Sequence, residues 1–566
     1  MGSIDHGDLS DAKSRIGIDY SAKTHIHGIK DHFHGNIKIY PHLQLFIDTP
    51  EFQRLRDIKQ LGATTYVWPC TTHTRFEHSL GVAFLARKMA THLQTIHPEL
   101  GISDRDIGCV EIAGLCHDLG HGPWSHVFDN LFIPTALPGV SWKHEDGSEM
   151  MFDYLIRDNE VPMPKDDQNF IKALIAGEHS RTPGEKVFLF DIIANKRNGL
   201  DVDKFDYLRR DSLHSSHPIN LDLERLIDSA RVLQDQIVYN IKDVNLVYDF
   251  FCNRFSMHKN VYNHKTTKAI EYMIIDALLA ADPYLKIAQR VFKAEEYINT
   301  TDHIMSQIKN SLEPELAEAR AILRAISKRE LYRHVDFKTI EWPLRDIFRR
   351  HVTSEKIVER ARSVFSKSDD VQDLQVSDVI VNFSTRSYGM REHNPVDHVL
   401  FYSKRNPTQC NKADRGVITS VLPKWFAEDV LNIYTKKAKH VAAVQAGYRA
   451  ILNDLQNDEN LTLNEEEDSF SAPPKGDDPS NTAKVSTSVG LGCPSTPPKA
   501  RAFRRTASIK DMGGEKDSTP FSNNAFTTLP VNLPPSPSQG RNSKSIKRKL
   551  GENFDSENNP TSKQRK

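Results

Sequence analysis

Residues 112–123 read Ile-Ala-Gly-Leu-Cys-His-Asp-Leu-Gly-His-Gly-Pro and place a histidine-aspartate pair where an apolar helical run stops. Gly120 and the dipeptide Gly122–Pro123 are expected to end this helix. Neighbouring side chains point about 100° apart on a helix, so His117 and Asp118 share no face in mid-helix. At a helix end both can turn toward one cation, and the free carbonyls of the last turn favour positive charge there. The pair predicts part of a metal site, although such pairs also arise by chance.

Two further ligands of suitable chemistry stand elsewhere in the chain. His78 shares a helical stripe with Val82, Leu85 and Met89, so its imidazole is expected to face the core. An ordinary core histidine is the alternative interpretation. Together with Asp203, the set offers two nitrogens and two carboxylates, which suits Fe, Mn, Zn or Ni. Such a set leaves coordination positions open for water and substrate, as metal-assisted hydrolysis requires.

Several titratable residues crowd the sequence after the pair. Cleavage of a phosphate ester needs a nucleophile, a proton for the leaving oxygen and neutralisation of phosphate charge. Pro123 suits the first turn of a helix, which would place His126 and Asp129 on one face. The candidates for proton transfer are therefore His121, His126, Asp129 and His144. A structural role for any one of these histidines is the alternative.

Composition bounds the class of protein. The chain has 566 residues, of which 38% are hydrophobic, enough for a large core and more than one domain. A net charge of −1 gives no general field for nucleic acid or membrane. The six cysteines show no CxxC spacing, which favours buried thiols in a reducing compartment. No apolar run has the length of a membrane span, and the polar start is no signal peptide. We expect a soluble intracellular protein without a membrane partner.

The pattern of apolar residues predicts a mainly α fold with a smaller α+β lobe near the C-terminus. The runs Val376–Phe383 and Val396–Tyr402 are rich in β-forming residues and predict a small sheet in that lobe. The tail is rich in Ser, Pro, Gly and charged residues and is expected to be disordered. The predicted parts are a flexible N-terminus, a helical catalytic core, the lobe and the tail, at residues 1–24, 25–375, 376–458 and 459–566.

The order His…His-Asp…Asp resembles the signature of the HD-domain metal-dependent phosphohydrolases. Four longer strings are similar to the sterile-alpha-motif/HD-domain deoxynucleoside triphosphate triphosphohydrolases, namely residues 48–56, 75–81, 113–123 and 198–207. The likeness extends from about His25 to about Tyr448. Only a short stretch precedes it, so no sterile-alpha-motif domain is expected. The resemblance implies an HD-domain helical core and cleavage of a deoxynucleoside triphosphate (dNTP) into deoxynucleoside and triphosphate.

The resemblance also implies roles for individual residues. It gives one divalent transition metal, with Mg accompanying the nucleotide, and the metal ligands His78, His117, Asp118 and Asp203. It makes His126 the proton donor, with Asp129 and His144 orienting it and His121 lining the site. Residues matching triphosphate contacts are Arg75, Lys204, Arg254 and Lys265. Each alone reads as a surface charge, and their placement beside motif residues favours Arg75 and Lys204 over the other two. Those matching sugar contacts are Gln60, Tyr207 and Asp211, while Leu61 and Tyr262 would crowd the 2′ carbon and exclude ribonucleotides.

Members of this family are activated by a guanine nucleotide between subunits, which implies GTP as effector and assembly from dimer to tetramer. The matching residues are Asp48, Gln53 and Arg56, which otherwise read as an ordinary capped helix beginning near Thr49–Pro50. The second, dNTP effector site departs from the family pattern: His27 replaces an expected lysine, Gln236–Lys242 is shorter and lacks two arginines, and Gln409 replaces another. We therefore expect GTP stimulation and weaker control by a second nucleotide.

The tail carries basic clusters at Lys544–Lys549 and Lys563–Lys566. They are typical of nuclear import signals read by an import receptor, of a single-stranded nucleic-acid contact, or of plain solubilising charge. Thr496-Pro-Pro-Lys499 has the pattern of a cyclin-dependent kinase site. We expect a nuclear dNTP triphosphohydrolase that controls dNTP pools. The alternatives are an HD-domain phosphohydrolase acting on another nucleotide and a nucleic-acid-binding scaffold.

Overall fold

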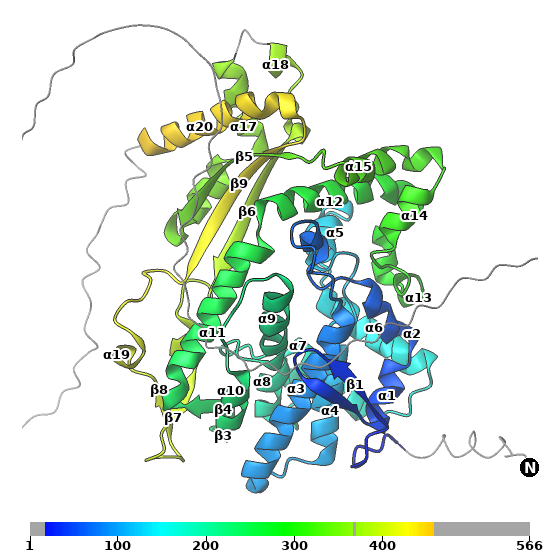
Figure 1. The fold of residues 1–566 in the computed structure, drawn as a ribbon, viewed down its shortest axis with the longest axis vertical. Coiled ribbons are helices and arrows are strands. Elements are labelled where there is room, and N and C mark those ends of the chain that lie inside the picture. The colour runs from blue at the N-terminus through cyan, green and yellow to red at the C-terminus, as the bar shows by residue number, and fades with distance from the viewer. Residues whose placement is uncertain (1–16, 366–368, 458–566) are drawn as a thin grey trace, which may run out of the picture. The chain divides into compact units, whose positions relative to one another are not determined.

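The computed structural model describes residues 17–365 and 369–457 of the chain. Most of the expected flexible N-terminus, the basic clusters of the tail and Thr496 lie outside the described residues. The predicted mainly α fold is confirmed (Figure 1). The helices up to residue 230 are α1 (Pro41–Ile47), α2 (Pro50–Gln53), α3 (Arg75–Ile96), α4 (Asp104–Cys116), α5 (Ile133–Ala136), α6 (His144–Asp158), α7 (Lys165–Ala176), α8 (Phe190–Ile193), α9 (Val202–His214) and α10 (Leu223–Ser229). The later ones are α11 (Val244–Met257), α12 (Lys265–Leu285), α13 (Ala294–Tyr297), α14 (Ile304–Asn310), α15 (Ala317–Ser327), α16 (Arg345–His351), α17 (Ser354–Val364), α18 (Asp369–Gln372), α19 (Arg415–Ile418) and α20 (Val441–Asn457).

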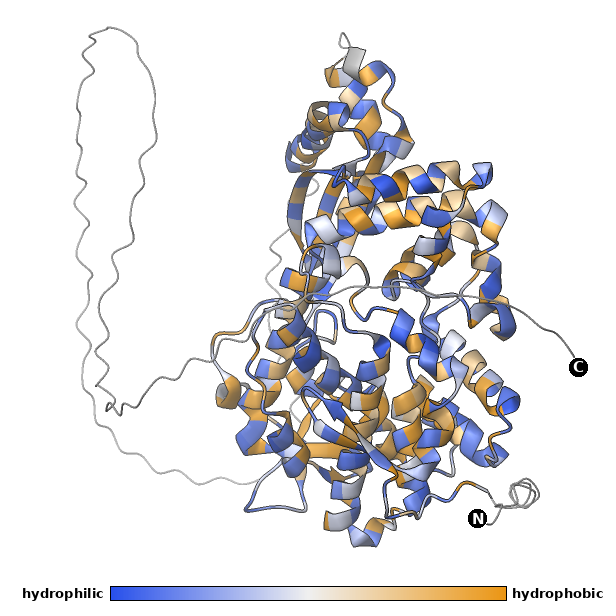
Figure 2. Ribbon diagram, turned by 45° about the vertical axis from the view of Figure 1, so that its right-hand side comes forward, coloured by the Kyte–Doolittle hydropathy of each residue, from blue (hydrophilic) through white to orange (hydrophobic). Residues whose placement is uncertain are grey.

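Helices α3 and α4 pack closely in the middle of the main core. Ser103 starts α4 with a capping box, in which its hydroxyl accepts the amide of Asp106 and the Asp106 carboxylate accepts the amide of Ser103. A Cβ at Gly114 would lie 3.2 Å from Ala86 of α3, so glycine permits the close approach. Figure 2 shows hydrophobic residues gathered where helices face one another. This packing brings the C-terminal end of α4 beside the first turn of α3.

The strands of the described residues form three small sheets. Their strands are β1 (His27–Asp31), β2 (Gly35–Ile39), β3 (Arg231–Leu233), β4 (Gln236–Asn240), β5 (Arg333–Glu341), β6 (Val379–Ser387), β7 (Leu400–Tyr402), β8 (Cys410–Lys412) and β9 (Ala427–Thr435). β1 and β2 form a hairpin, the second sheet has the order β3-β4-β7-β8, and the third has the order β5-β9-β6. Helices α17 and α20 pack together and against the third sheet.

The structure corrects one expected strand. The sequence predicts that the run Val396–Tyr402 belongs to the sheet of the C-terminal lobe, but β7 pairs in parallel with β4, with Phe401 opposite Tyr239. Val399 and Phe401 are buried in the main core, and this burial selects β4 as the partner. The other run, Val376–Phe383, does enter the three-stranded sheet through β6.

The lobe has a hydrophobic core of its own. Leu431 and Tyr448 share it with Ile340 and Ile357. The lobe therefore includes residues upstream of the boundary at 376 that the sequence predicts.

Among residues 17–365 and 369–457, no helix combines the length and the apolar character that a membrane crossing requires.

Candidate active site

The four predicted metal ligands come together where α3, α4 and α9 meet. His78 lies in the first turn of α3, His117 and Asp118 directly follow α4, and Asp203 lies in the first turn of α9. Nε2 of His78 is 3.1 Å from Oδ1 of Asp203 and 3.6 Å from Oδ2 of Asp118. Nε2 of His117 is 3.4 Å from Oδ1 of Asp118 and 3.5 Å from Oδ1 of Asp203. We call these four residues the metal cluster.

Both imidazoles of the metal cluster are oriented by partners on their far side. Nδ1 of His117 donates to the Gly114 carbonyl at 2.8 Å, so Nε2 of the neutral ring carries the lone pair. That Nε2 atom is buried and has no hydrogen-bond partner among the described residues. Nδ1 of His78 lies 2.8 Å from Oδ2 of Asp206, as metal-bound histidines commonly pair with a carboxylate. The donor set and the unpaired Nε2 fit a divalent cation.

The electrostatics of the metal cluster favour positive charge. Burial disfavours a charged imidazole, yet hydrogen bonds and charge from Asp203, Asp206 and Asp118 raise the pKa of His78 to about 10. Burial also disfavours ionised Asp118, but the Arg75 guanidinium holds the pKa of that carboxyl well below its usual range. The cluster holds a proton on His78, and a divalent cation would replace that proton.

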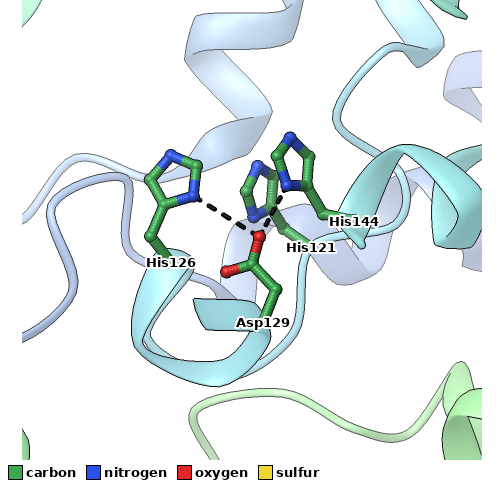
Figure 3. A group of neighbouring side chains, drawn as sticks. All are labelled: His121, His126, Asp129 and His144. Carbon is green, nitrogen blue, oxygen red and sulfur yellow. Dashed lines mark hydrogen bonds and ion pairs between the residues drawn. The ribbon is translucent and has the colours of Figure 1, made fainter. Parts of the chain in front are cut away.

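A second cluster, which we call the histidine cluster, consists of His121, His126, Asp129 and His144 (Figure 3). Nδ1 of His144 donates to Oδ2 of Asp129 at 2.6 Å, and Nδ1 of His126 lies 3.5 Å from the same oxygen. The ring of His121 stacks on that of His144 with centroids 3.9 Å apart. The His126 side chain is 61% exposed while that of Asp129 is 4% exposed. The exposed ring of His126 can therefore reach a bound molecule, while the buried Asp129 carboxylate orients the His126 ring.

The charge states within the histidine cluster follow from burial. Burial disfavours ionised Asp129, but hydrogen bonds from His126 and His144 hold its pKa below the usual range. Burial, reinforced by the positive charge of Arg75, lowers the pKa of His121 well below its usual value. Asp129 is consequently an anion and His121 a neutral ring at physiological pH.

The loop that joins the clusters differs from the expected helix start. The sequence predicts Pro123 in the first helical turn, but the helix begins at His126. The physical reason is that Trp124 and Ser125 both have a φ of 57°, in the left-handed region. His126 and Asp129 nevertheless lie close together, at the separation i, i+3 that the sequence indicates.

Gly120 has a different role from the predicted one. Helix α4 ends at Cys116 before Gly120 is reached. A Cβ at Gly120 would collide with the His144 carbonyl and the Ser148 amide at the start of α6. Gly120 therefore permits the close approach of α6 that brings His144 to the histidine cluster.

Three of the residues expected to contact the sugar come together on the α9 side. The Tyr262 hydroxyl donates to Oδ2 of Asp211 at 2.8 Å. The rings of Tyr207 and Tyr262 have centroids 6.5 Å apart. Tyr207 follows Asp203 by four residues on α9, so both lie on one helix face. The expected sugar contacts thus adjoin the metal cluster.

Gln60 and Leu61 precede a short 3₁₀ helix at Gly62–Tyr66. The Gln60 amide donates to the His73 carbonyl at 3.0 Å, and its side-chain Oε1 is buried without a hydrogen-bond partner among the described residues. Leu61 is half-buried against the main core. Both residues are held next to His73, which contacts Asp211.

Two of the four expected triphosphate cations are close to the metal cluster. Arg75 is buried, with Nη1 2.5 Å from Oδ2 of Asp118 and Nε donating to the Ser125 hydroxyl at 2.9 Å. Lys204 follows Asp203 of the metal cluster directly in the sequence, and its ammonium donates to Asp201 at 2.7 Å. Arg75 is therefore already paired with a carboxylate of the metal cluster.

The other two cations contact the lobe. Nη1 of Arg254 donates to the Ser387 carbonyl at 2.6 Å, and its positive charge opposes the burial that raises the pKa of Tyr207. Lys265 is exposed at the start of α12, where its carbonyl accepts a hydrogen bond from Tyr434 of β9. Arg254 therefore lies near the residues expected to contact the sugar, whereas the Lys265 backbone contacts the lobe.

The expected effector residues lie at the surface around α2. Asp48 accepts from Gln44 at 2.7 Å, and Nε of Arg56 donates to Oε1 of Gln53 at 2.7 Å. Thr49 caps α2 and Pro50 is its first residue, so the capped helix of the alternative interpretation is present as well. Asp48 and Arg56 are exposed and Gln53 is half-buried.

The positions that depart from the family pattern fall in two sheets. Gln236–Asn240 is strand β4, and Gln409 immediately precedes β8 of the same four-stranded sheet. His27 begins β1 of the separate hairpin.

Sequence reasoning missed three residues that support the site. Asp206, which binds His78, follows Asp203 by three residues on α9, and this spacing was a usable signal. His73 contacts Asp211 across 138 positions of sequence, and Asp302 contacts the Trp124 amide across 178. No local pattern marks such distant pairs.

Comparison with known proteins gives two family matches. Residues 75–232 match the HD domain, and residues 221–397 match the HD associated region. The first match contains all four residues of the metal cluster and all four of the histidine cluster.

Several relatives are similar over most of their length. The chain is 41% identical over 442 residues to deoxynucleoside triphosphate triphosphohydrolase SAMHD1 of Homo sapiens, covering 72% of this chain and 70% of the relative. It is 40% identical over 451 residues to the Mus musculus protein of the same name, covering 72% and 68%. It is 38% identical over 438 residues to the SAMHD1 homolog of Dictyostelium discoideum, covering 77% and 82%.

Proposed function

Because this chain belongs to the family of HD-domain deoxynucleoside triphosphate triphosphohydrolases, we propose that it cleaves dNTPs into deoxynucleoside and inorganic triphosphate. The observation that carries the proposal is the contact between the two clusters, in which His121 lies 3.3 Å from Asp118. Four converging candidate metal ligands thereby adjoin an exposed histidine that is paired with a buried carboxylate. This arrangement supplies a place for a phosphate and a proton donor for its leaving group.

His78, His117, Asp118 and Asp203 would hold the metal, which when bound supplies Lewis acidity to the α-phosphate and to the attacking water. We propose Fe, Mn, Zn or Ni for this site and Mg accompanying the triphosphate. Asp206 and the Gly114 carbonyl fix the two imidazoles with Nε2 toward the cluster.

The side chains of the histidine cluster handle the proton. In the proposed reaction a new bond forms between water oxygen and the α-phosphorus, and the bond from that phosphorus to O5′ of the sugar breaks. The proton that the attacking water releases goes to solvent, from which His126 is protonated again. His126 gives its Nε2 proton to O5′, since Asp129 holds the opposite ring nitrogen, Nδ1. His144 shares the same Asp129 oxygen and fixes the position of that carboxylate, while neutral His121 lies between His144 and Asp118 of the metal cluster.

The residues on the sugar side support a deoxyribose. Asp211 accepts a hydrogen bond from Tyr262, which leaves the Tyr262 ring edge and the Leu61 side chain as candidates to fill the space of a 2′-hydroxyl. Tyr207, Asp211 and Gln60 are proposed to contact the 3′-hydroxyl. Buried, unpaired Oε1 of Gln60 is free to accept such a hydrogen bond.

We also propose regulation by GTP through Asp48, Gln53 and Arg56. Their position at the surface suits a nucleotide shared with a second copy of the chain, and we propose assembly of dimers into tetramers. Carboxylate and guanidinium groups match the donor and acceptor edges of guanine. The altered second effector positions, Gln236–Lys242 and Gln409, support weaker dependence on dNTP activation.

In the cell, we propose that the enzyme limits dNTP pools in the nucleus. The support is the pair of basic clusters in the tail, which are also candidates to bind single-stranded nucleic acid, and the kinase pattern at Thr496. These features concern residues outside those that the structure describes.

The test of the proposed activity incubates the full chain with each dNTP and NTP, with Mn²⁺ and Mg²⁺, with and without GTP. Anion-exchange chromatography separates triphosphate, pyrophosphate and phosphate. We expect deoxynucleoside and triphosphate from dNTPs, with more product when GTP is present. Pyrophosphate and nucleoside monophosphate as the products, or equal turnover of ATP and dATP, would contradict the proposal.

A further inference from the structure

One buried carboxylate outside both clusters holds the loop that joins them. Oδ1 of Asp302 accepts the Trp124 amide at 2.7 Å, and Oδ2 accepts the Lys59 amide at 3.1 Å. The Lys59 ammonium lies 3.7 Å from the same Oδ2, and the Asp302 side chain is only 9% exposed. Asp302 therefore ties the backbone just before His126 to the backbone just before Gln60.

The loop needs such a tie because its conformation is unfavourable. Trp124 and Ser125 are consecutive residues with a φ of 57°, a region that costs free energy for any residue with a Cβ. A Cβ at Gly62 would lie 2.8 Å from the Trp124 carbonyl oxygen, so the backbone at Gly62, close to Lys59 in the sequence, also packs tightly against this loop. The Ser125 hydroxyl donates to the Lys59 carbonyl at 2.8 Å. The strained turn at Trp124–Ser125 is therefore held by contacts with Asp302 and with the backbone of Lys59.

The opposite end of the loop is fixed independently. Arg54 donates to the Leu119 carbonyl at 2.7 Å and to the Thr300 carbonyl at 2.8 Å. The Tyr297 hydroxyl donates to the Gly120 carbonyl at 2.7 Å. Loss of Asp302 would thus leave the end that follows His117 and Asp118 in place. The effect would be concentrated on the end that precedes His126.

We propose that Asp302 is a positioning residue that holds the left-handed turn at Trp124–Ser125 and thereby sets the direction from which His126 meets the leaving group. This inference rests on the proposed function of His126 as proton donor. Asp302 acts through the Trp124 amide and touches neither cluster directly.

The experiment compares Asp302→Ala and Asp302→Asn in the full chain. A misplacement of about 1 Å can cost on the order of a hundredfold in rate, so we expect Asp302→Ala to lower kcat by roughly tenfold to a hundredfold with KM nearly unchanged. Asp302→Asn keeps an oxygen that can accept the Trp124 amide and should lose less. Metal content should remain that of the wild type, and hydrogen exchange at the Trp124 amide should become faster in Asp302→Ala.

Asp378→Ala is the matched control. Asp378 is also buried, accepts the Gln375 amide at 3.1 Å and pairs with Lys437 at 3.0 Å, but it lies in the C-terminal lobe. General destabilisation should affect Asp378→Ala and Asp302→Ala alike. Only Asp302→Ala should change kcat and the rate of hydrogen exchange at the Trp124 amide.

A second comparison tests the role of strain. Glycine adopts a φ of 57° without penalty, so in a Ser125→Gly background the loss caused by Asp302→Ala should shrink, by about fivefold or more. Equal kcat for Asp302→Ala and Asp378→Ala, together with unchanged exchange at Trp124, would overturn the inference. If the wild-type chain hydrolyses no dNTP, the proposed function fails, while the exchange measurement still decides whether Asp302 holds the turn.

Discussion

Nε2 of His121 lies 3.3 Å from Oδ1 of Asp118, and this contact joins the metal cluster to the histidine cluster. His121 is neutral because burial lowers its pKa, and its other face stacks on His144. One uncharged ring thus separates the Asp118 carboxylate from the pair of Asp129 and His144. In the proposed reaction, His126 would therefore act beside the metal cluster with no second charged histidine between them.

Removal of metal ligands should abolish both metal binding and turnover. In the double variant His117→Ala/Asp118→Ala the cluster loses a nitrogen and a carboxylate, so elemental analysis should find no stoichiometric metal. Circular dichroism should show the helical content retained. His42→Ala is a matched control, because His42 is a buried histidine 2.8 Å from Glu111 outside both clusters. Full metal occupancy in the double variant places the metal elsewhere.

Replacement of the exposed histidine should affect the rate alone. His126→Asn removes the proton donor, and kcat for a dNTP should fall by roughly 10²–10⁴-fold. The side chain is 61% exposed and the Asn amide can still donate to Asp129, so the free energy of unfolding should change by no more than about 1 kcal/mol. His393→Asn, at a side chain that is 70% exposed beside Glu392, is the control. A kcat within twofold of the control, on the order of the experimental scatter, excludes His126 as the acid.

A smaller residue at position 61 should relax discrimination against ribonucleotides. Leu61→Ala removes side-chain atoms that are proposed to exclude the 2′-hydroxyl sterically. The ratio of kcat/KM for dATP to that for ATP should therefore fall by about tenfold or more. Leu100→Ala, at a leucine that is also half-buried against the main core, should leave the ratio unchanged. An unaltered ratio in Leu61→Ala assigns the discrimination to other residues.

Metal uptake should release a proton. Despite burial, which disfavours the charged ring, the surrounding carboxylates raise the pKa of His78 to about 10, and coordination requires that ring nitrogen unprotonated. The free cluster holds the proton at neutral pH and the loaded cluster does not, so affinity for Mn²⁺ should rise with pH, by up to about tenfold per unit, until about pH 10. Calorimetry in buffers of different ionisation enthalpy counts the proton. Affinity that does not vary between about pH 6.5 and 8.5 contradicts the assignment.

Deletion of the C-terminal basic clusters should change location. Removal of residues 540–566 takes away both lysine-rich clusters while leaving every described residue. A fluorescent fusion should move from nucleus to cytoplasm, because the import receptor loses its contact. Replacing the tail by a neutral one of equal length controls for size. An unchanged nuclear signal removes the localisation proposal.

The metal cluster was accessible to sequence reasoning because helix periodicity and ligand chemistry are local. His78 faces the core along the stripe of Val82 and Leu85, and the pair after α4 stands at a helix end, as the apolar pattern predicts. The turn at Trp124 and Ser125 was not accessible, since its left-handed backbone depends on Asp302, 178 positions from Trp124. The expectation of a helix from Pro123 failed for that reason.

The predicted position of β7 in the sheet of the lobe was wrong for a related reason. Val396–Tyr402 has the composition of a strand, but composition does not identify a partner. Pairing with β4 is selected by burial of Val399 and Phe401 in the main core. Local patterns predicted the elements and the ligand types, whereas contacts between distant segments decided how they are arranged.

The most direct test of the proposed chemistry is hydrolysis of dGTP in water enriched in ¹⁸O. The products are separated, and mass spectrometry counts the ¹⁸O atoms in each. Attack of water at the α-phosphorus, with His126 protonating O5′, predicts one ¹⁸O atom in inorganic triphosphate and unlabelled deoxyguanosine. Label in the deoxynucleoside, or pyrophosphate with deoxyguanosine monophosphate as products, would contradict it.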